Sequence, residues 1–376
     1  MKTNSDVLSK NRITEKFLEL TGIDSESFNE RKMADALKEE LRNLGLIFLE
    51  DDAGEKTGGN AGNILAFFEG NPSYEPIFLS AHMDTVVPGK SKKAILGEDG
   101  IIRSDKTTVL GSDDLAGVTE ILEGIRRVKE SGKDHRSVEI LFTVAEEAYT
   151  KGAAVFDYSK IKSKEAYCLD LSGDVGDAVI KAGSLISFTI KVTGRASHAG
   201  FEPEAGINAI AVASKAIANI KQGRVDEEST LNIGTISGGS ARNIVPEECL
   251  VSGEIRSYNH EKALALYEKV KAVFDEEANN AGAESEADYT IHIKAYEVNE
   301  EDSTVKRFVK VCEELNLPGN LKSTLGGADC HQFNANGIKG IVLSCGMENV
   351  HTRDEYIKTD NLLAGAKLVE KLITEI

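Results

Sequence analysis

The sequence predicts an α/β protein whose larger domain is interrupted by a smaller α+β domain. Short apolar runs of strand length alternate with helical patterns near both ends of the chain, as in a sheet covered by helices on both faces. Between residues 182 and 296 apolar and polar residues alternate instead, as in a half-exposed antiparallel sheet. The length of 376 residues fits two domains.

Residues 1–181 supply the first expected helices and buried strands. The segment SFNE at 27–30 has the capping-box pattern that starts a helix, and apolar residues follow at helical spacing as far as Gly45. NILAFFEG, PIFLSAH, VEILFTVAEE and EAYCLDL are predicted strands, and DDLAGVTEILEGIRRVKESG is a predicted helix. The pattern returns at 297–376 with the strand GIKGIVLSCGM, so we assign both segments to one domain.

Residues 182–296 are expected to form the inserted domain. The predicted elements are the strand SLISFTIKVTG, a helix, the strands TLNIGTISGG and ECLVSGEIRSYN, a second helix, and the strand YTIHIKAYEV. This β-α-β-β-α-β order is that of a ferredoxin-like domain. The acidic stretch AGAESEADY before the last strand is expected to be a solvated loop. We interpret the inserted domain as a lid.

The composition excludes several classes of partner. With 44 Lys+Arg against 62 Asp+Glu, the net charge of −18 argues against nucleic acid or an anionic membrane. The N-terminus has no apolar signal segment, and no apolar run has the length of a membrane span. The five cysteines are scattered and lack CxxC spacing, which predicts a cytoplasmic protein without disulfides.

One buried strand ends on His82 and Asp84, whose side chains point to the same side of the strand. Such a pair is either a structural hydrogen-bonded pair or a metal ligand with the group that orients it. Four other polar clusters lie in the α/β segments: Asp113 with Asp114, Glu146 with Glu147, Asp170, and His351. Taken singly, these clusters also fit a helix N-cap, a solvated strand end, a turn and a surface histidine.

Together the clusters favour a metal site. In α/β sheets, sites form at the carboxyl ends of strands, where most of these residues lie. Two histidines and several carboxylates suit Zn, Mn or Co, with enough oxygen atoms for two ions sharing a carboxylate. Adjacent Glu146 and Glu147 point opposite ways in an extended chain, so one can bind metal while the other acts as general base. This division of roles is typical of a metal-assisted hydrolase.

The segments HMDTV, GSDDLAG, AEEA, LDLSG and GGAD…VHT resemble, in order and spacing, the M20 family of metallopeptidases. GSDDLAG, GGADCHQFNANGI and VHTRDEY are most similar to its peptidase T-like branch of tripeptide aminopeptidases. The resemblance implies a zinc-exopeptidase-like, three-layer α/β/α catalytic domain with a ferredoxin-like lid through which the chain forms a homodimer.

The resemblance also implies two divalent metal ions, expected to be zinc, with manganese or cobalt as alternatives. One ion would be held by His82, Asp113 and Asp170. The other would be held by Asp113, Glu147 and His351, so that Asp113 bridges the two ions. The peptide bond that follows Asp113 is expected to be cis.

Further roles follow from the same resemblance. Glu146 would be the general base, and Asp84 would orient the first histidine ligand. His198 of GRASHAG would polarise the scissile carbonyl, in dimers from the partner subunit; an ordinary surface histidine is the alternative. Asn243 and Arg256 would hold the substrate carboxylate, and a salt bridge within the lid is the alternative for Arg256.

One segment departs from the family pattern, because Cys330 and His331 stand where smaller or amide side chains are expected. We interpret His331 as structural, with a role in the specificity pocket as the alternative. Aspartate rather than glutamate at position 170 favours a peptidase over a deacylase.

The expected function is hydrolysis of the N-terminal peptide bond of short peptides by a two-metal enzyme. An N-acyl-amino-acid amidohydrolase or a dipeptidase would use the same chemistry on another substrate. A non-catalytic relative is the third hypothesis, and the complete ligand set together with Glu146 argues against it.

Overall fold

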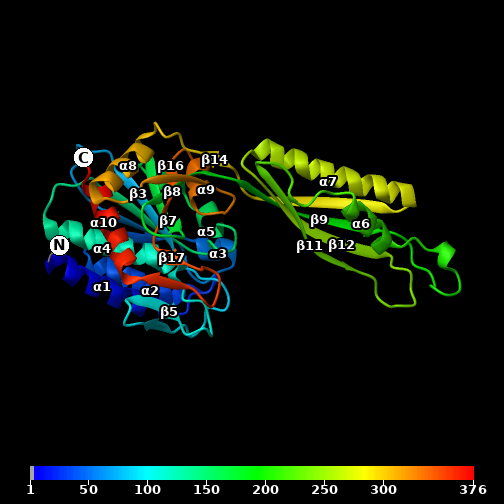
Figure 1. The fold of residues 1–376 in the computed structure, drawn as a ribbon, viewed down its shortest axis with the longest axis horizontal. Coiled ribbons are helices and arrows are strands. Elements are labelled where there is room, and N and C mark those ends of the chain that lie inside the picture. Colours follow the sequence, from blue (N-terminus) through cyan, green and yellow to red (C-terminus); the bar gives the residue numbers. More distant parts are fainter. Residues whose placement is uncertain (1–3) are drawn as a thin grey trace. The chain divides into compact units, whose positions relative to one another are not determined.

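The computed structural model describes residues 4–376 and divides into two compact units. Unit one comprises the chain as far as Lys181 together with Glu297–Ser323 and Ala328–Ile376. Unit two comprises Ala182–Tyr296 and the short segment Thr324–Gly327. Figure 1 shows both units coloured along the chain.

A nine-stranded sheet forms the centre of unit one (Figure 1). Its four middle strands, in the order β6-β3-β7-β16, run parallel, and antiparallel strands flank them on either side. The strands are β1 (Ile47–Glu50), β2 (Ile64–Phe68), β6 (Val138–Thr143), β3 (Ile77–His82), β7 (Glu165–Leu171), β16 (Lys339–Ser344), β8 (Asp177–Ala182) and β14 (Tyr296–Glu297), with β15 (Asn320–Thr324) paired to β8. Every residue of β3 and β6 is buried, which explains their unbroken apolar sequences.

Helices cover both faces of this sheet. On one face Phe78 of β3 packs edge-to-face on Phe333 of α9, with ring centroids 4.8 Å apart. Tyr167 of β7 contacts a different helix, α8, where its hydroxyl group donates a hydrogen bond to the carbonyl oxygen of Thr304 at 3.2 Å. The helices of unit one are α1 (Asn4–Thr21), α2 (Arg31–Asn43), α3 (Ala53–Thr57), α4 (Ser112–Ser131), α5 (Lys151–Ala154), α8 (Ser303–Leu315), α9 (Cys330–Ala335) and α10 (Thr359–Thr374).

A second sheet in unit one has four short strands in the order β17-β18-β5-β4. These strands are β17 (Met347–Glu348), β18 (Tyr356–Lys358), β5 (Ile101–Ser104) and β4 (Ala94–Leu96). None of them was predicted from the sequence, because each is only two to four residues long. The sheet joins the segment before α4 to the segment after β16.

The predicted capping box at residues 27–30 is wrong. Helix α2 begins at Arg31, and Glu30 precedes it without a capping hydrogen bond from its side chain. The Ser27 hydroxyl donates to Asp84 Oδ2 at 2.7 Å, and Glu30 Oε1 accepts the N–H group of Ala145 at 3.1 Å. Both side chains therefore bind distant parts of unit one instead of the helix end.

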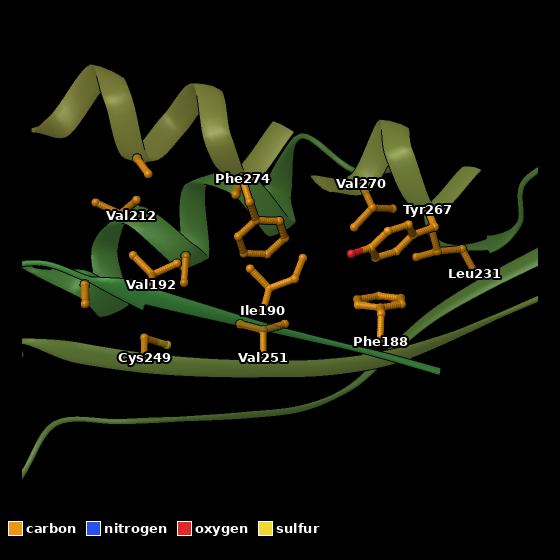
Figure 2. Close-up of a cluster of buried hydrophobic side chains, with 14 of the residues drawn as sticks. Phe188, Ile190, Val192, Val212, Leu231, Cys249, Val251, Tyr267, Val270 and Phe274 are labelled. Atoms are coloured by element: carbon orange, nitrogen blue, oxygen red, sulfur yellow. The ribbon is translucent and has the colours of Figure 1, made fainter. Parts of the chain in front are cut away.

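Unit two is a five-stranded antiparallel sheet in the order β10-β11-β12-β9-β13. Two helices pack on it, and Figure 2 shows their contact with the sheet, including Phe188 of β9, Tyr267 and Phe274 of α7, and Val212 of α6. The elements are β9 (Ser184–Thr193), α6 (Ala209–Ala218), β10 (Gly223–Arg224), β11 (Ser229–Gly238), β12 (Glu248–Ser257), α7 (His260–Ala281) and β13 (Glu284–Ile293). This arrangement confirms the predicted fold class, an α/β protein with an α+β insertion.

The acidic stretch 281–289 is not the solvated loop that we predicted. Strand β13 begins at Glu284 and pairs with β9 along the sheet edge. Three acidic residues, Glu284, Glu286 and Asp288, alternate along this strand, and charged side chains are common on exposed sheet edges. Among residues 4–376, no helix has the length and apolar character that crossing a membrane requires.

Candidate metal centre

Residues that can bind a metal gather at one end of the large sheet of unit one. Because β3, β6 and β7 run parallel, their carboxyl ends meet at the same edge of the sheet. The residues are His82 at the end of β3, Glu146 and Glu147 just after β6, Asp170 near the end of β7, Asp113 in the first turn of α4, and His351 between β17 and β18.

The carboxylate of Asp113 lies between the two histidines. Its Oδ1 is 3.0 Å from His82 Nε2, and its Oδ2 is 3.1 Å from His351 Nε2. His82 Nε2 also lies 3.7 Å from Asp170 Oδ1, and His351 Nε2 lies 2.8 Å from Glu147 Oε1. The five predicted ligands therefore form two groups that share Asp113, with one histidine in each group.

The charges of these groups match a site for divalent cations. The two neighbouring carboxylates, Asp113 and Glu147, raise the pKa of His351 to about 10. Burial raises the pKa of Asp170 to about 7, and burial also raises the pKa of Glu147. Three carboxylates thus share this centre with two histidines, a set of ligands of the type that Zn, Mn and Co prefer.

Asp114 contributes to the same region, although no separate role was predicted for it. The peptide bond between Asp113 and Asp114 is cis, as the resemblance implied. Asp114 Oδ2 accepts the backbone N–H of His82 at 3.1 Å, and its Oδ1 accepts the N–H of Gly117 at 3.2 Å. His82, Asp114 and Asp170 also place ligand atoms within 4.8 Å of one another. Asp114 therefore fixes the backbone of His82 through this hydrogen bond.

His82 is held in the tautomer that a metal ligand needs. Its Nδ1 lies 2.9 Å from the backbone carbonyl oxygen of Asp84, which can only accept a hydrogen bond. Nδ1 therefore carries a proton, and the Nε2 atom faces Asp113 and Asp170. The carboxylate of Asp84 is farther away, with Oδ1 at 3.5 Å from Nδ1. Asp84 thus orients His82 mainly through its main chain.

The carboxylate of Asp84 instead holds the turn that follows β6. Its two oxygens accept the N–H groups of Glu146 at 3.0 Å and Glu147 at 3.2 Å. The two preceding N–H groups of this turn are bound by Asn63 and Glu30, at 3.1 Å each. Four consecutive N–H groups are therefore bound by buried side chains, which fixes the direction of both glutamates.

Within this turn the two glutamates have different surroundings. Glu147 contacts His351, whereas Glu146 is half-buried, and burial together with the charge of Asp170 raises its pKa well above the ordinary value. The two side chains therefore differ in their contacts.

The unusual pair Cys330 and His331 lies in helix α9, and both residues are buried. His331 Nδ1 is 2.9 Å from the carbonyl oxygen of Ala328, a contact that supports a structural role. The preceding Asp329, which the sequence analysis did not single out, is also buried and accepts the Thr143 hydroxyl hydrogen at 2.5 Å. Its other oxygen has no hydrogen-bond partner, and burial raises its pKa to about 7.

The three remaining predicted site residues belong to unit two. The exposed His198 accepts the N–H groups of Gly200 and Phe201 at Nδ1, both at 3.1 Å, so its proton lies on Nε2. The carbonyl oxygen of Asn243 accepts the N–H of Ala199 at 3.0 Å, so the His198 and Asn243 loops are adjacent. In this tautomer of His198, the Nε2–H group can donate a hydrogen bond to a developing oxyanion.

Arg256 on β12 is already engaged within unit two. Its guanidinium donates from Nε to Glu254 Oε1 at 2.9 Å and from Nη1 to the carbonyl oxygen of Leu325 at 2.9 Å. The salt bridge that the sequence analysis kept as the alternative for Arg256 is therefore present. These contacts and a longer one from Nη2 to Glu254 use three of the five N–H groups of the guanidinium.

Comparison with known proteins gives consistent matches over the whole chain. A family model described as the peptidase dimerisation domain of the M20 type matches residues 180–282. The Bacillus subtilis (strain 168) protein YqjE is 36% identical over 369 residues, which cover 98% of this chain and 99% of that protein. A tripeptidase from Staphylococcus aureus subsp. aureus mu50 superposes with a TM-score of 0.94 at 34% identity, covering 97% of this chain and 98% of the other. For the aminopeptidase PepT from Bacillus cereus ATCC 10987, the TM-score is 0.92 at 34% identity, with the same coverage.

Proposed function

We propose a function from one premise: this chain belongs to the peptidase T-like branch of the M20 metallopeptidase family. The proposed reaction is hydrolysis of the N-terminal peptide bond of short peptides, above all tripeptides. The two structures at 34% identity are described as a tripeptidase and an aminopeptidase, which supports this substrate class. The observation that carries the proposal is the shared Asp113, which has one histidine on each of its two oxygens.

We infer that two divalent ions, expected to be zinc, bind at this centre. His82, Asp113 and Asp170 would hold one ion, and Asp113, Glu147 and His351 would hold the other. Ions bound there would polarise the scissile carbonyl and lower the pKa of a water molecule. The excess of buried carboxylates over histidines supports this assignment.

Glu146 would act as the general base. Its backbone is fixed by Asp84, and its side chain does not join the His351 contact that Glu147 makes. It would accept a proton from the attacking water and transfer that proton to the leaving amine. A pKa raised above the ordinary value suits this transfer near neutral pH.

Unit two would complete the site within a homodimer. The match of residues 180–282 to a dimerisation domain supports assembly through this unit. The partner subunit's His198 would donate its Nε2–H to the oxyanion that forms on the scissile carbonyl. Asn243 and Arg256 would hold the substrate carboxylate, Arg256 with the N–H groups that do not contact Glu254 or Leu325. A cytoplasmic location is part of the proposal, and the five cysteines, which all lie within residues 4–376, are buried and form no disulfide.

Glu146→Gln tests the assignment of the base. The variant keeps the side-chain size and the N–H bond to Asp84, so metal content should equal that of the wild type. Loss of the base should lower kcat by about 10²- to 10⁴-fold. Metal analysis and peptide hydrolysis on the same preparation provide the comparison. Activity near that of the wild type would show that another group moves the proton.

A further inference from the structure

We propose that Glu355 is a positioning residue that fixes Asp113 and His351 relative to each other and thereby sets the affinity for the second metal ion. The inference rests on the proposed function, in which these two side chains bind the same ion. Glu355 touches neither the reacting atoms nor the ions. It acts through the backbone of the segment that presents Asp113.

The contacts of the Glu355 carboxylate all lead to this segment. Oε2 accepts the backbone N–H groups of Leu110 at 2.6 Å and Gly111 at 2.9 Å. Oε1 accepts the Ser112 hydroxyl hydrogen at 2.6 Å and the backbone N–H of Asp113 at 3.1 Å. Glu355 is only 1% exposed, so water does not compete for these bonds. Four donors occupy the acceptor positions of one carboxylate, which leaves none for a metal ion.

Glu355 also belongs to the segment that carries His351. The turn between them is internally bonded: the Thr352 hydroxyl donates to the carbonyl oxygen of Asn349 at 2.7 Å, and Asp354 N–H donates to the Thr352 hydroxyl at 3.2 Å. The carbonyl oxygen of Glu355 accepts the N–H of Ser104 at 3.3 Å, which ties the turn to β5.

These bonds close a ring around one half of the metal centre. The ring runs from the Asp113 backbone to the Glu355 carboxylate, along the turn to His351, and back to the Asp113 side chain through the 3.1 Å contact. The His351 side chain is half exposed, and the ion-pair contacts that fix its ring are those with Asp113 and Glu147. Without the bonds of the Glu355 carboxylate, the Asp113 backbone would lose its direct hydrogen bond to the segment that carries His351, and the pairing of β18 with β5 would hold that segment less directly.

Glu355→Gln interrupts this ring with little change of shape. A glutamine side chain has one acceptor oxygen, so its amide N–H₂ group must face either the Leu110–Gly111 pair or the Ser112–Asp113 pair. Outer groups that orient metal ligands typically change metal affinity by about 10- to 100-fold when removed. We expect a loss of this size for the Zn²⁺ ion that Asp113 shares with Glu147 and His351. The loss should be smaller for the other ion, because the buried His82 and Asp170 hold it together with Asp113.

Glu139→Gln is the matched control. Glu139 lies on β6, is 5% exposed, and accepts the N–H of Lys162, the N–H of Ser163 and the Ser163 hydroxyl hydrogen, at 2.9, 2.9 and 2.6 Å. It therefore has the same chemistry as Glu355, a buried carboxylate that binds backbone donors. It lies near the start of its strand and contacts no predicted ligand. Its replacement should cost stability and leave both Zn²⁺ affinities unchanged.

The experiment is calorimetric titration of Zn²⁺ into chelator-treated, full-length wild type and variants, with the metal content checked by mass spectrometry. The inference predicts two Zn²⁺ ions per wild-type chain, a larger weakening of one ion than of the other in Glu355→Gln, and wild-type affinities in Glu139→Gln. Ser112→Ala removes a single donor and should weaken the same ion by about fivefold, which provides a test if Glu355→Gln does not fold.

Three results overturn the inference. Unchanged affinities in Glu355→Gln and Ser112→Ala would show that Glu355 has no effect on the site. An equal loss in Glu139→Gln would show a general effect of lower stability. Fewer than two Zn²⁺ ions in the wild type would refute the proposed two-metal function itself, and the inference with it, before any variant is compared.

Discussion

Replacing Glu30 by glutamine should remove a defined part of the pH dependence of stability. Glu30 is fully buried beside the turn that presents Glu146 and Glu147. Its Oε1 accepts the N–H groups of Phe28 at 2.8 Å and Ala145 at 3.1 Å, whereas Oε2 has no hydrogen-bond partner. Burial, and then the nearby charge of Asp84, raise the pKa of Glu30 to about 7.

The size of the effect follows from this pKa. The ordinary value is 4.5, so between 4.5 and about 7 the folded protein holds a proton on Glu30 that the unfolded chain has lost. The free energy of unfolding therefore falls as pH rises through this window, and the stabilisation is complete only below it. At ~1.4 kcal/mol per pH unit, ionised Glu30 destabilises the folded state by about 3 kcal/mol.

The assay is urea denaturation of chelator-treated wild type, Glu30→Gln and the exposed control Glu98→Gln, at about pH 5 and about pH 8. Glutamine keeps an acceptor for the N–H groups and cannot ionise. Relative to the wild type, Glu30→Gln should gain about 2–3 kcal/mol on going from the lower to the higher pH, and Glu98→Gln should gain none. Identical pH dependence in Glu30→Gln and wild type would refute the reasoning.

Two further predictions concern other buried charges. Glu120 is fully buried in α4, and both its carboxylate oxygens lack a hydrogen-bond partner, so Glu120→Met should raise the free energy of unfolding by about 1–3 kcal/mol; a lower urea midpoint than that of the wild type would contradict this. Because Asp113 and Glu147 raise the pKa of His351 to about 10, a metal ion must displace a proton from this ring at neutral pH. Apparent Zn²⁺ affinity should therefore increase with pH up to about 10, and calorimetry in buffers of different ionisation enthalpy should detect the released proton.

The parts of the site that could be predicted from sequence are those where polar or charged residues end an otherwise apolar strand. His82, Asp170 and the Glu146–Glu147 pair end apolar strands, where charged groups are costly unless they have a purpose. Parallel strands then bring such ends together without any further information. For this reason the structure brings His82 within a few ångströms of Asp170 and of Asp113 and Glu147.

The groups that position the ligands could not be predicted, because their partners are distant in sequence. Ser27 and Glu30 have a local pattern that suits a helix cap, but they bind Asp84 and Ala145, which are 57 and 115 residues away. Glu355 lies in the polar segment TRDEY, which suggests an exposed turn, yet it is buried against the start of α4, 242 residues earlier.

The first part of strand β13, residues 284–288, was missed for a different reason. Its acidic residues lie on the edge strand of the sheet in unit two, where alternating charged side chains remain exposed while the backbone pairs with β9. The acidic and polar composition of residues 281–289 is therefore typical of a loop when it is considered alone. Burial of the alternate residues was needed to identify the strand.

The central claim, an aminopeptidase with two metal ions, is tested most directly by the products from two substrates. A free tripeptide and its N-acetylated twin would be incubated with enzyme loaded with Zn, Mn or Co, and the products identified by mass spectrometry. The account predicts release of the first residue from the free peptide and no reaction of the blocked twin. Deacylation of the twin with the free peptide left intact would contradict it.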